Sequence, residues 1–127
     1  KDNKEVPKLI KKAEKDFDYL TAIGGSGPAF LAEYIAAQLV YAKSKSLNEA
    51  MARDIVFKTI LGAGTYLDAT KVSPQEFVKL VSSPGGTTEA GIKLLKNKKF
   101  TNIIVQCLDS ASKKSVKISD KLVMKKN

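Results

Sequence analysis

The sequence predicts an all-α domain of about five helices, and three observations support this fold class. No stretch alternates apolar and polar residues as a half-buried strand does. Apolar residues instead recur at steps of three and four residues, which is the spacing of one helix face. A serine followed three positions later by glutamate, the pattern of a helix start, occurs twice.

The composition is that of a globular protein without a metal site. The 127 residues are 43% apolar and 28% charged, and they contain no run of 18 apolar residues, so no membrane span is expected. The single cysteine, Cys107, leaves no internal disulfide and fits a reducing compartment, so the cytoplasm is the expected location. No histidine is present, which removes the commonest metal ligand and the commonest general base.

The net charge of +9 sits at the two ends of the chain. Residues 93–127 hold ten basic and two acidic residues, whereas residues 16–92 hold six basic and eight acidic residues. A basic segment of this kind can bind nucleic acid. However, the only arginine is Arg53 and no aromatic residues alternate with the lysines, so a solvated lysine face explains the charge better and no nucleic-acid partner is expected.

The chain divides by pattern into a polar start and a helical domain. Residues 1–15 are expected to be a linker or the tail of an upstream domain, with at most a short helix starting near Pro7. Residues 16–127 are expected to form the all-helical domain.

The domain is expected to open with a glycine-rich loop at residues 24–28. Ser26 or Gly27 suits the N-cap of the following helix, and Pro28 suits its first turn. Between residues 29 and 42 only Glu33 and Gln38 are polar, so this helix is buried on most sides. In so short a chain a partner subunit is the expected cover, with a central helix of a monomeric bundle as the alternative.

The next three helices are placed by their start signals. Ser46 and Glu49 match a capping box that opens a helix running to about Leu67. Two glycines inside that helix, Gly62 and Gly64, indicate close approach by another helix or a kink. Ser73 and Glu76 match a second capping box with proline at the first helical position.

The last two helices lie beyond the Ser83 segment. The first of them ends near residues 97–99, and Thr101 is the expected cap of the final helix.

The segment Ser83-Pro84-Gly85-Gly86-Thr87-Thr88 has the features of an anion site. Its two glycines permit positive φ angles and close approach of a ligand to the backbone. Thr87 or Thr88 is expected to cap the following helix, whose free N–H groups and dipole favour a carboxylate or phosphate. The plain alternative is a Pro-Gly-Gly turn followed by a threonine cap.

These motifs together resemble the C-terminal domain of pyrroline-5-carboxylate reductases over about residues 16–120. The matching stretches are Thr21–Phe30, Glu49-Ala50, Ser83–Thr88 and Gly91. The resemblance implies an all-α domain of the 6-phosphogluconate dehydrogenase C-terminal type that forms an interlocked homodimer, often within a ring of dimers. It also implies reduction of 1-pyrroline-5-carboxylate to L-proline by NADPH or NADH, the last step of proline biosynthesis.

The same resemblance implies roles for particular residues. Ser83 and the backbone N–H groups of Gly86 and Thr87 would bind the substrate carboxylate, and Thr88 would be the catalytic residue facing the ring nitrogen. A cap bond to its own helix is the alternative role for Thr88. The nicotinamide side would be lined by four residues of the first motif: Thr21, Ser26, Gly27 and Pro28.

The resemblance further implies an N-terminal Rossmann domain that binds the dinucleotide cofactor, so residues 1–15 would be the linker or tail of that domain. Such a nucleotide-binding domain is not found in these residues, because no Gly-x-Gly-x-x-Gly follows a predicted strand. These residues alone are therefore expected to supply carboxylate binding and dimerisation without catalysis. Two alternatives stay open: a non-catalytic helical oligomerisation module, and a related reductase of another cyclic imine.

Overall fold

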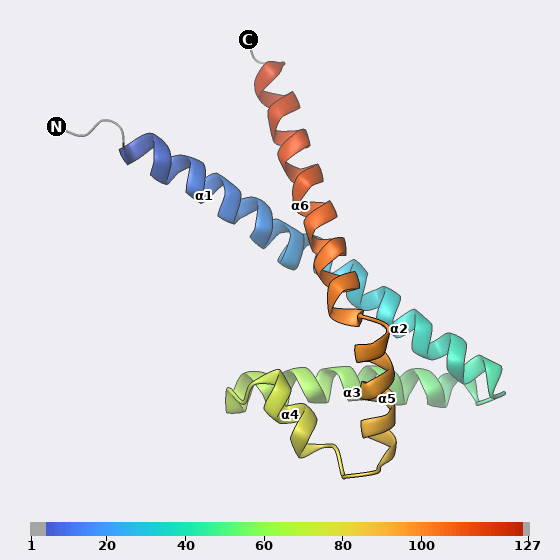
Figure 1. The fold of residues 1–127 in the computed structure, drawn as a ribbon. Helices are drawn as coiled ribbons and strands as arrows, with labels where there is room; N and C mark the ends of the chain where they lie inside the picture. Colours follow the sequence, from blue (N-terminus) through green and yellow to red (C-terminus); the bar gives the residue numbers. More distant parts are fainter. Residues whose placement is uncertain (1–4, 126–127) are drawn as a thin grey trace. The chain divides into compact units, whose positions relative to one another are not determined.

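The structure, a computed structural model, describes residues 5–125 and confirms the all-α prediction. Within that range the chain forms six α-helices and one π-helical turn. In chain order they are α1 (Glu5–Thr21), η1 (Ala22–Ser26), α2 (Gly27–Ser44), α3 (Glu49–Thr70), α4 (Pro74–Leu80), α5 (Thr87–Asn97) and α6 (Phe100–Met124) (Figure 1). No helix among the described residues is long and apolar enough to cross a bilayer.

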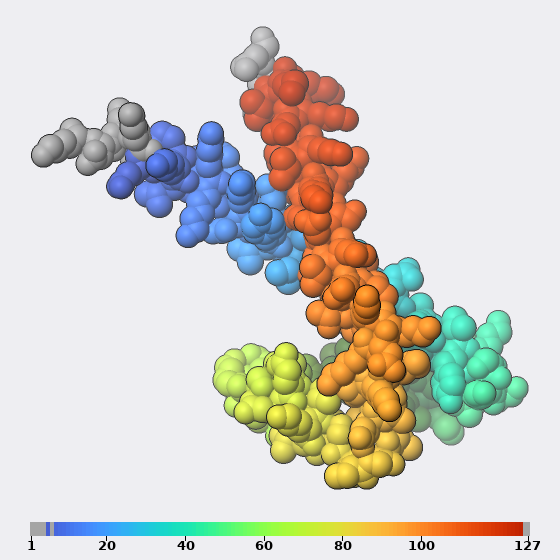
Figure 2. Space-filling model, viewed as in Figure 1, coloured from blue at the N-terminus to red at the C-terminus, as the bar shows by residue number. Residues whose placement is uncertain are grey.

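The described residues fall into two compact units, residues 5–31 with 101–125 and residues 32–100. In the first unit, α1 and α6 are joined by a hydrogen bond that the Ser115 hydroxyl donates to the Asp18 carboxylate, 2.5 Å long. Asp18 is only 8% exposed, so this bond satisfies a buried charge. Toward their free ends the two helices diverge (Figures 1 and 2).

Helix α1 begins at Glu5 and continues to Thr21, so residues 5–15 are helical. Residues 1–4 of the predicted linker lie outside the described part of the chain. The role of residues 1–15 as a linker stays a prediction.

The predicted loop at residues 24–28 is wrong, and neither Ser26 nor Gly27 is an N-cap. Residues 22–26 form the π-helical turn, and Gly27 has helical angles of φ −53° and ψ −41°. Pro28 gives the physical reason for the wide turn. In an α-helix its ring would collide with the carbonyl of the residue four positions earlier, Gly24, and widening the helix there removes the collision while keeping the chain helical.

In the second unit, the corner between α2 and α3 differs from the predicted capping box. Ser46 has a φ of +54°, and the N–H of Leu47 bonds the carbonyl of Ala42, which together end α2 in a Schellman motif. The cap of α3 is Asn48, whose side chain accepts from the Met51 N–H at 3.0 Å. Ser46 therefore closes one helix instead of opening the next.

The predicted start of α4 is confirmed. The Ser73 hydroxyl accepts from the Glu76 N–H at 3.2 Å, and the Glu76 carboxylate accepts from the Ser73 N–H at 3.1 Å. The rings of Tyr66 and Phe77, with centroids 5.3 Å apart, join α3 to α4. By contrast, Thr101 is no cap, because α6 already begins at Phe100.

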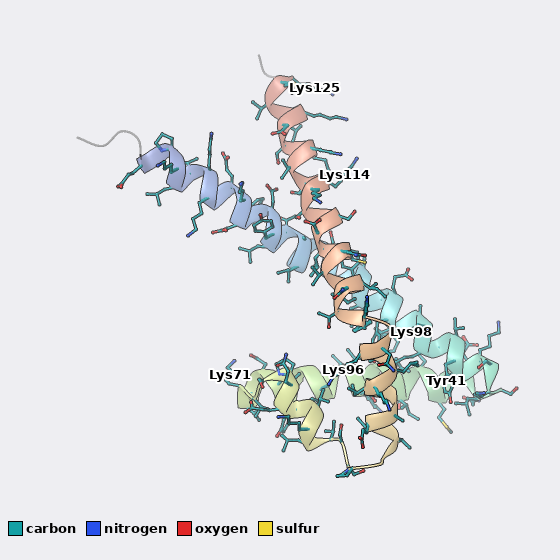
Figure 3. All side chains as sticks on the ribbon, viewed as in Figure 1. Tyr41, Lys71, Lys96, Lys98, Lys114 and Lys125 are labelled. Carbon is teal, nitrogen blue, oxygen red and sulfur yellow. The ribbon has the colours of Figure 1, made fainter. Side chains whose placement is uncertain are left out.

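Few apolar side chains are buried in the described residues. The buried apolar residues are Ala22, Ala42, Ala52 and Val56, so three of the four are alanine. Apart from the adjacent residues and backbone of α3 itself, no described atom lies within 4 Å of a methyl group built on Gly62 or Gly64, so the predicted contact with another helix is not made within the described chain. Lys114 on α6 and Lys125, which directly follows α6, are exposed (Figure 3).

Candidate functional site

The segment between α4 and α5 forms a tight turn. Pro84 and Gly85 hold its two central positions, Gly85 has a φ of +71°, and the Gly86 N–H donates to the Ser83 carbonyl at 3.0 Å. These are the features of a type II turn, which requires glycine or asparagine at its third position. A methyl group on Gly86 would lie 2.5 Å from the Ser83 hydroxyl oxygen, so the turn also packs the Ser83 side chain against Gly86.

The turn leads directly into α5, whose N-cap is Gly86. The prediction that Thr87 or Thr88 caps this helix is wrong, since both lie inside its first turn and no side-chain cap bond is made. Within residues 5–125 the N–H groups of Thr87, Thr88 and Glu89 have no hydrogen-bond partner. Three free donors at the positive end of a helix dipole are suited to bind an anion.

Glu89 also contacts this turn, and the sequence analysis did not identify it as a residue of the site. Its carboxylate accepts a hydrogen bond from the Gly85 N–H across four residues. The available signal was its position: like Glu76 in α4, Glu89 is the third residue of its helix, from which a carboxylate can reach back to the preceding backbone.

Thr88 is half-buried and lines an apolar groove of about 850 Å³ between α2, α3 and α5. Polar side chains that share the groove come from α2: Tyr34, Gln38 and Tyr41. Because the Thr88 hydroxyl makes no bond to the described residues of the chain, it is available to a ligand in this groove.

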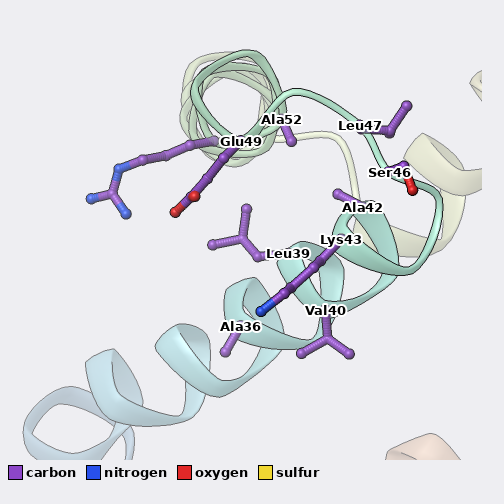
Figure 4. A pocket seen from close by; sticks show the side chains of 10 residues that line it. Ala36, Leu39, Val40, Ala42, Lys43, Ser46, Leu47, Glu49 and Ala52 are labelled. Atoms are coloured by element: carbon purple, nitrogen blue, oxygen red, sulfur yellow. The ribbon is translucent and has the colours of Figure 1, made fainter.

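A second hollow lies at the corner between α2 and α3 and contains none of the predicted site residues (Figure 4). It has a volume of about 470 Å³, an apolar floor that includes Leu39 and Ala52, and charged side chains such as Lys43 and Glu49. Val40 points away from α3 and is 68% exposed (Figure 4).

The four residues predicted to line the nicotinamide side lie together on the π-helical turn and its flanks. Thr21 precedes the turn, Ser26 ends it, and Gly27 and Pro28 begin α2. Methyl groups built on Gly24 or Gly27 would meet no atom within 4 Å, so this helix face permits close approach of a flat ring. Single-turn π segments of this kind are frequent at functional sites.

A family model described as "Pyrroline-5-carboxylate reductase dimerisation" matches residues 14–118 of the chain. Among curated proteins, pyrroline-5-carboxylate reductase 2 of Bacillus subtilis is 36% identical over 107 residues, covering 84% of this chain and 38% of the relative. The pyrroline-5-carboxylate reductase of Arabidopsis thaliana is 34% identical and covers 90% of this chain and 41% of the relative.

Solved structures show the same relationship. The pyrroline carboxylate reductase of Plasmodium falciparum, determined with NADP bound, matches with a TM-score of 0.76 at 28% identity, over 80% of this chain and 38% of that one. The 1-pyrroline-5-carboxylate reductase of Streptococcus pyogenes matches with a TM-score of 0.76 at 35% identity, over 80% of this chain and 39% of that one. The chain thus spans about two fifths of the length of these relatives.

Proposed function

Because the chain belongs to the pyrroline-5-carboxylate reductase dimerisation family, we propose that it serves the reduction of 1-pyrroline-5-carboxylate to L-proline. In this proposal the chain binds the substrate carboxylate and joins two subunits, while a nucleotide-binding domain holds the cofactor. By themselves the 127 residues bind substrate and assemble without catalysing hydride transfer. The observation that carries the proposal is the family match together with an intact Ser83–Thr88 segment that ends in free helix N–H groups.

The substrate carboxylate binds at the start of α5. The Thr87 N–H, which has no partner among the described residues, is the first backbone donor, with the Thr88 N–H beside it. Gly86 was expected to contribute a donor as well, but its N–H is held by the Ser83 carbonyl in this structure. We therefore assign Gly86 the role of letting the Ser83 hydroxyl approach the anion, since no side chain stands between them.

Thr88 is the catalytic residue of the proposal. When bound, a nicotinamide cofactor supplies the hydride that reduces the C=N carbon of the ring. The Thr88 hydroxyl contacts the ring nitrogen, where it orients the imine and relays a proton from water to the nitrogen as the ring carbon accepts the hydride. The chain has no histidine for this task, and the Thr88 hydroxyl is not engaged by its own helix.

The residues of the π-helical turn fit only one part of such a cofactor. The open helix face at Gly24 and Gly27 accommodates a flat ring, with Thr21 and Ser26 able to bond polar groups at its edge. Residues 5–125 contain no strand, and therefore none of the strand-turn-helix geometry that binds a pyrophosphate. The adenine and phosphate end of NADPH or NADH is accordingly assigned to the nucleotide-binding domain.

The proposed assembly is a homodimer in which apolar helix faces cover each other. The family is named for dimerisation, and α2 presents exposed apolar side chains such as Leu31 (45%), Val40 (68%) and Tyr41 (64%). A ring of such dimers is the proposed larger form. The free thiol of Cys107 fits a cytoplasmic enzyme.

Substitution of Thr88 tests the proposed chemistry. In a reductase that carries this chain beside its nucleotide-binding domain, Thr88→Ala is expected to lower kcat/KM for the imine by about 10- to 100-fold, the value of a hydrogen bond to a charged group. Thr88→Ser keeps the hydroxyl and is expected to retain most of the activity. An unchanged kcat/KM in Thr88→Ala, measured by NADPH oxidation, contradicts the assigned role.

A further inference from the structure

Glu89 makes a contact that the proposed reaction leaves unexplained. Its carboxylate accepts from the Gly85 N–H, which lies one residue before the N-cap of its own helix. In an ordinary capping box, as at Ser73 and Glu76, the glutamate accepts from the N–H of the N-cap itself. At α5 that donor, the Gly86 N–H, is already used by the Ser83 carbonyl. Glu89 therefore reaches one residue further back, into the turn.

The contact fixes the most easily deformed part of the turn. Gly85 holds a φ of +71°, a conformation that glycine adopts freely but also leaves freely. The Gly85 N–H is not used by the hydrogen bond that closes the turn, which runs from Gly86 to Ser83. The Glu89 carboxylate is its partner among the described residues and so ties the turn to the first turn of α5.

We propose that Glu89 is a positioning residue of the substrate-carboxylate site. This inference rests on the proposed function. By holding Gly85, Glu89 keeps the Ser83 hydroxyl and the Thr87 and Thr88 N–H groups aimed at one point, without touching substrate itself. The acceptor oxygen is the required feature. The negative charge is a cost, because it lies near the bound carboxylate and repels it.

Two substitutions separate the acceptor from the charge. Glu89→Ala removes both and is expected to raise KM for the imine about tenfold, with kcat within about twofold of the native value. Glu89→Gln keeps an acceptor oxygen and removes the charge, so its KM is expected to be equal to the native KM or lower. If Glu89→Gln is as impaired as Glu89→Ala, the proposal is overturned.

Glu76 provides the matched control. It is also the third residue of a helix and also accepts from a preceding backbone N–H, but it belongs to the start of α4. Glu76→Ala is expected to weaken its helix to a similar extent and to leave KM unchanged. Equal increases in KM for Glu76→Ala and Glu89→Ala would show a general stability effect and overturn the positioning role.

A second readout does not depend on catalysis. Amide hydrogen exchange at Gly85, followed in the same intact reductase, is expected to be about tenfold faster in Glu89→Ala than in the native protein and close to native in Glu89→Gln. Unchanged exchange in Glu89→Ala overturns the inference. An inactive native enzyme with this exchange pattern would instead overturn the proposed function and leave the role of Glu89 in the turn standing.

Discussion

At the scale of single residues, Gly86 is the position where the carboxylate site tolerates least change. A methyl group there would lie 2.5 Å from the Ser83 hydroxyl oxygen and 3.0 Å from the Ser83 carbonyl oxygen. The side-chain contact alone is relieved by rotation of Ser83, but the contact with the carbonyl moves the backbone that closes the turn. Gly86 thus links the shape of the turn to the position of the Ser83 hydroxyl.

Gly86→Ala is expected to raise KM for the imine by about tenfold or more, because Ser83 is displaced from the anion. Gly62→Ala is the control, since Gly62 lies in α3 outside the site and a methyl group there meets no atom within 4 Å. Steady-state kinetics of both variants check this. A Gly86→Ala enzyme with the KM of Gly62→Ala would show that close packing against Ser83 is not required.

At the scale of helices, the sequence predicts a cap where the capping side chain and the backbone group that it bonds lie within a few residues of each other. Ser73 and Glu76 form the expected reciprocal bonds, and the Pro-Gly-Gly turn was expected from its residues. The cap at Ser46 was wrong because two helix signals overlap there: a serine with positive φ ends α2, and Asn48, two residues later, caps α3.

The glycine-rich segment before α2 shows a second limit of sequence reasoning. Glycine permits a loop but does not require one, and residues 22–27 are helical. Long helices on both sides continue through the segment, and Pro28 is accommodated by widening one turn. The predicted site residues Thr21 and Ser26 lie on this one short segment, and their role stays a prediction. Its π-helical form depends on the continuity of the flanking helices and not on local propensity.

The cap of α4 makes a pH-dependent contribution to stability. The hydrogen bond from the Ser73 hydroxyl, followed by that from the Ser73 N–H, lowers the pKa of Glu76 below its ordinary value of 4.5. A carboxylate with a lowered folded-state pKa stabilises the fold above its unfolded pKa, and this contribution is lost as the pH falls through the folded pKa. The Tm values of the native protein and of Glu76→Gln are therefore expected to differ above the ordinary carboxyl pKa of 4.5 and to converge as the pH falls through the lowered folded-state pKa. A Tm difference between the two proteins that does not change with pH would contradict the link between stability and protonation of Glu76.

At the scale of the whole molecule, both compact units expose large apolar side chains. Large apolar side chains are exposed on α1, α2, α3 and α6, among them Leu20 at 66%, Val40 at 68%, Leu61 at 67% and Leu122 at 60%. The side chains that are buried are small. In the proposed homodimer, burial of these side chains against a second copy supplies much of the hydrophobic stabilisation.

Folding coupled to dimerisation has a measurable consequence, which is that stability depends on protein concentration. The protein is expected to be a dimer by light scattering at micromolar concentration, and its Tm is expected to rise by several degrees between about 1 and 100 µM, since mass action over that range contributes about 2.7 kcal/mol.

Val40→Asp places a charge on an exposed, outward-facing position of α2 and is expected to shift the protein to monomer and lower Tm. Lys58→Ala, which removes only a surface pair with Asp54 on the same helix, is expected to remain dimeric. A monomeric native protein with a concentration-independent Tm would mean that the exposed faces of α2 are not an interface, and that the helices reach their stability within one chain.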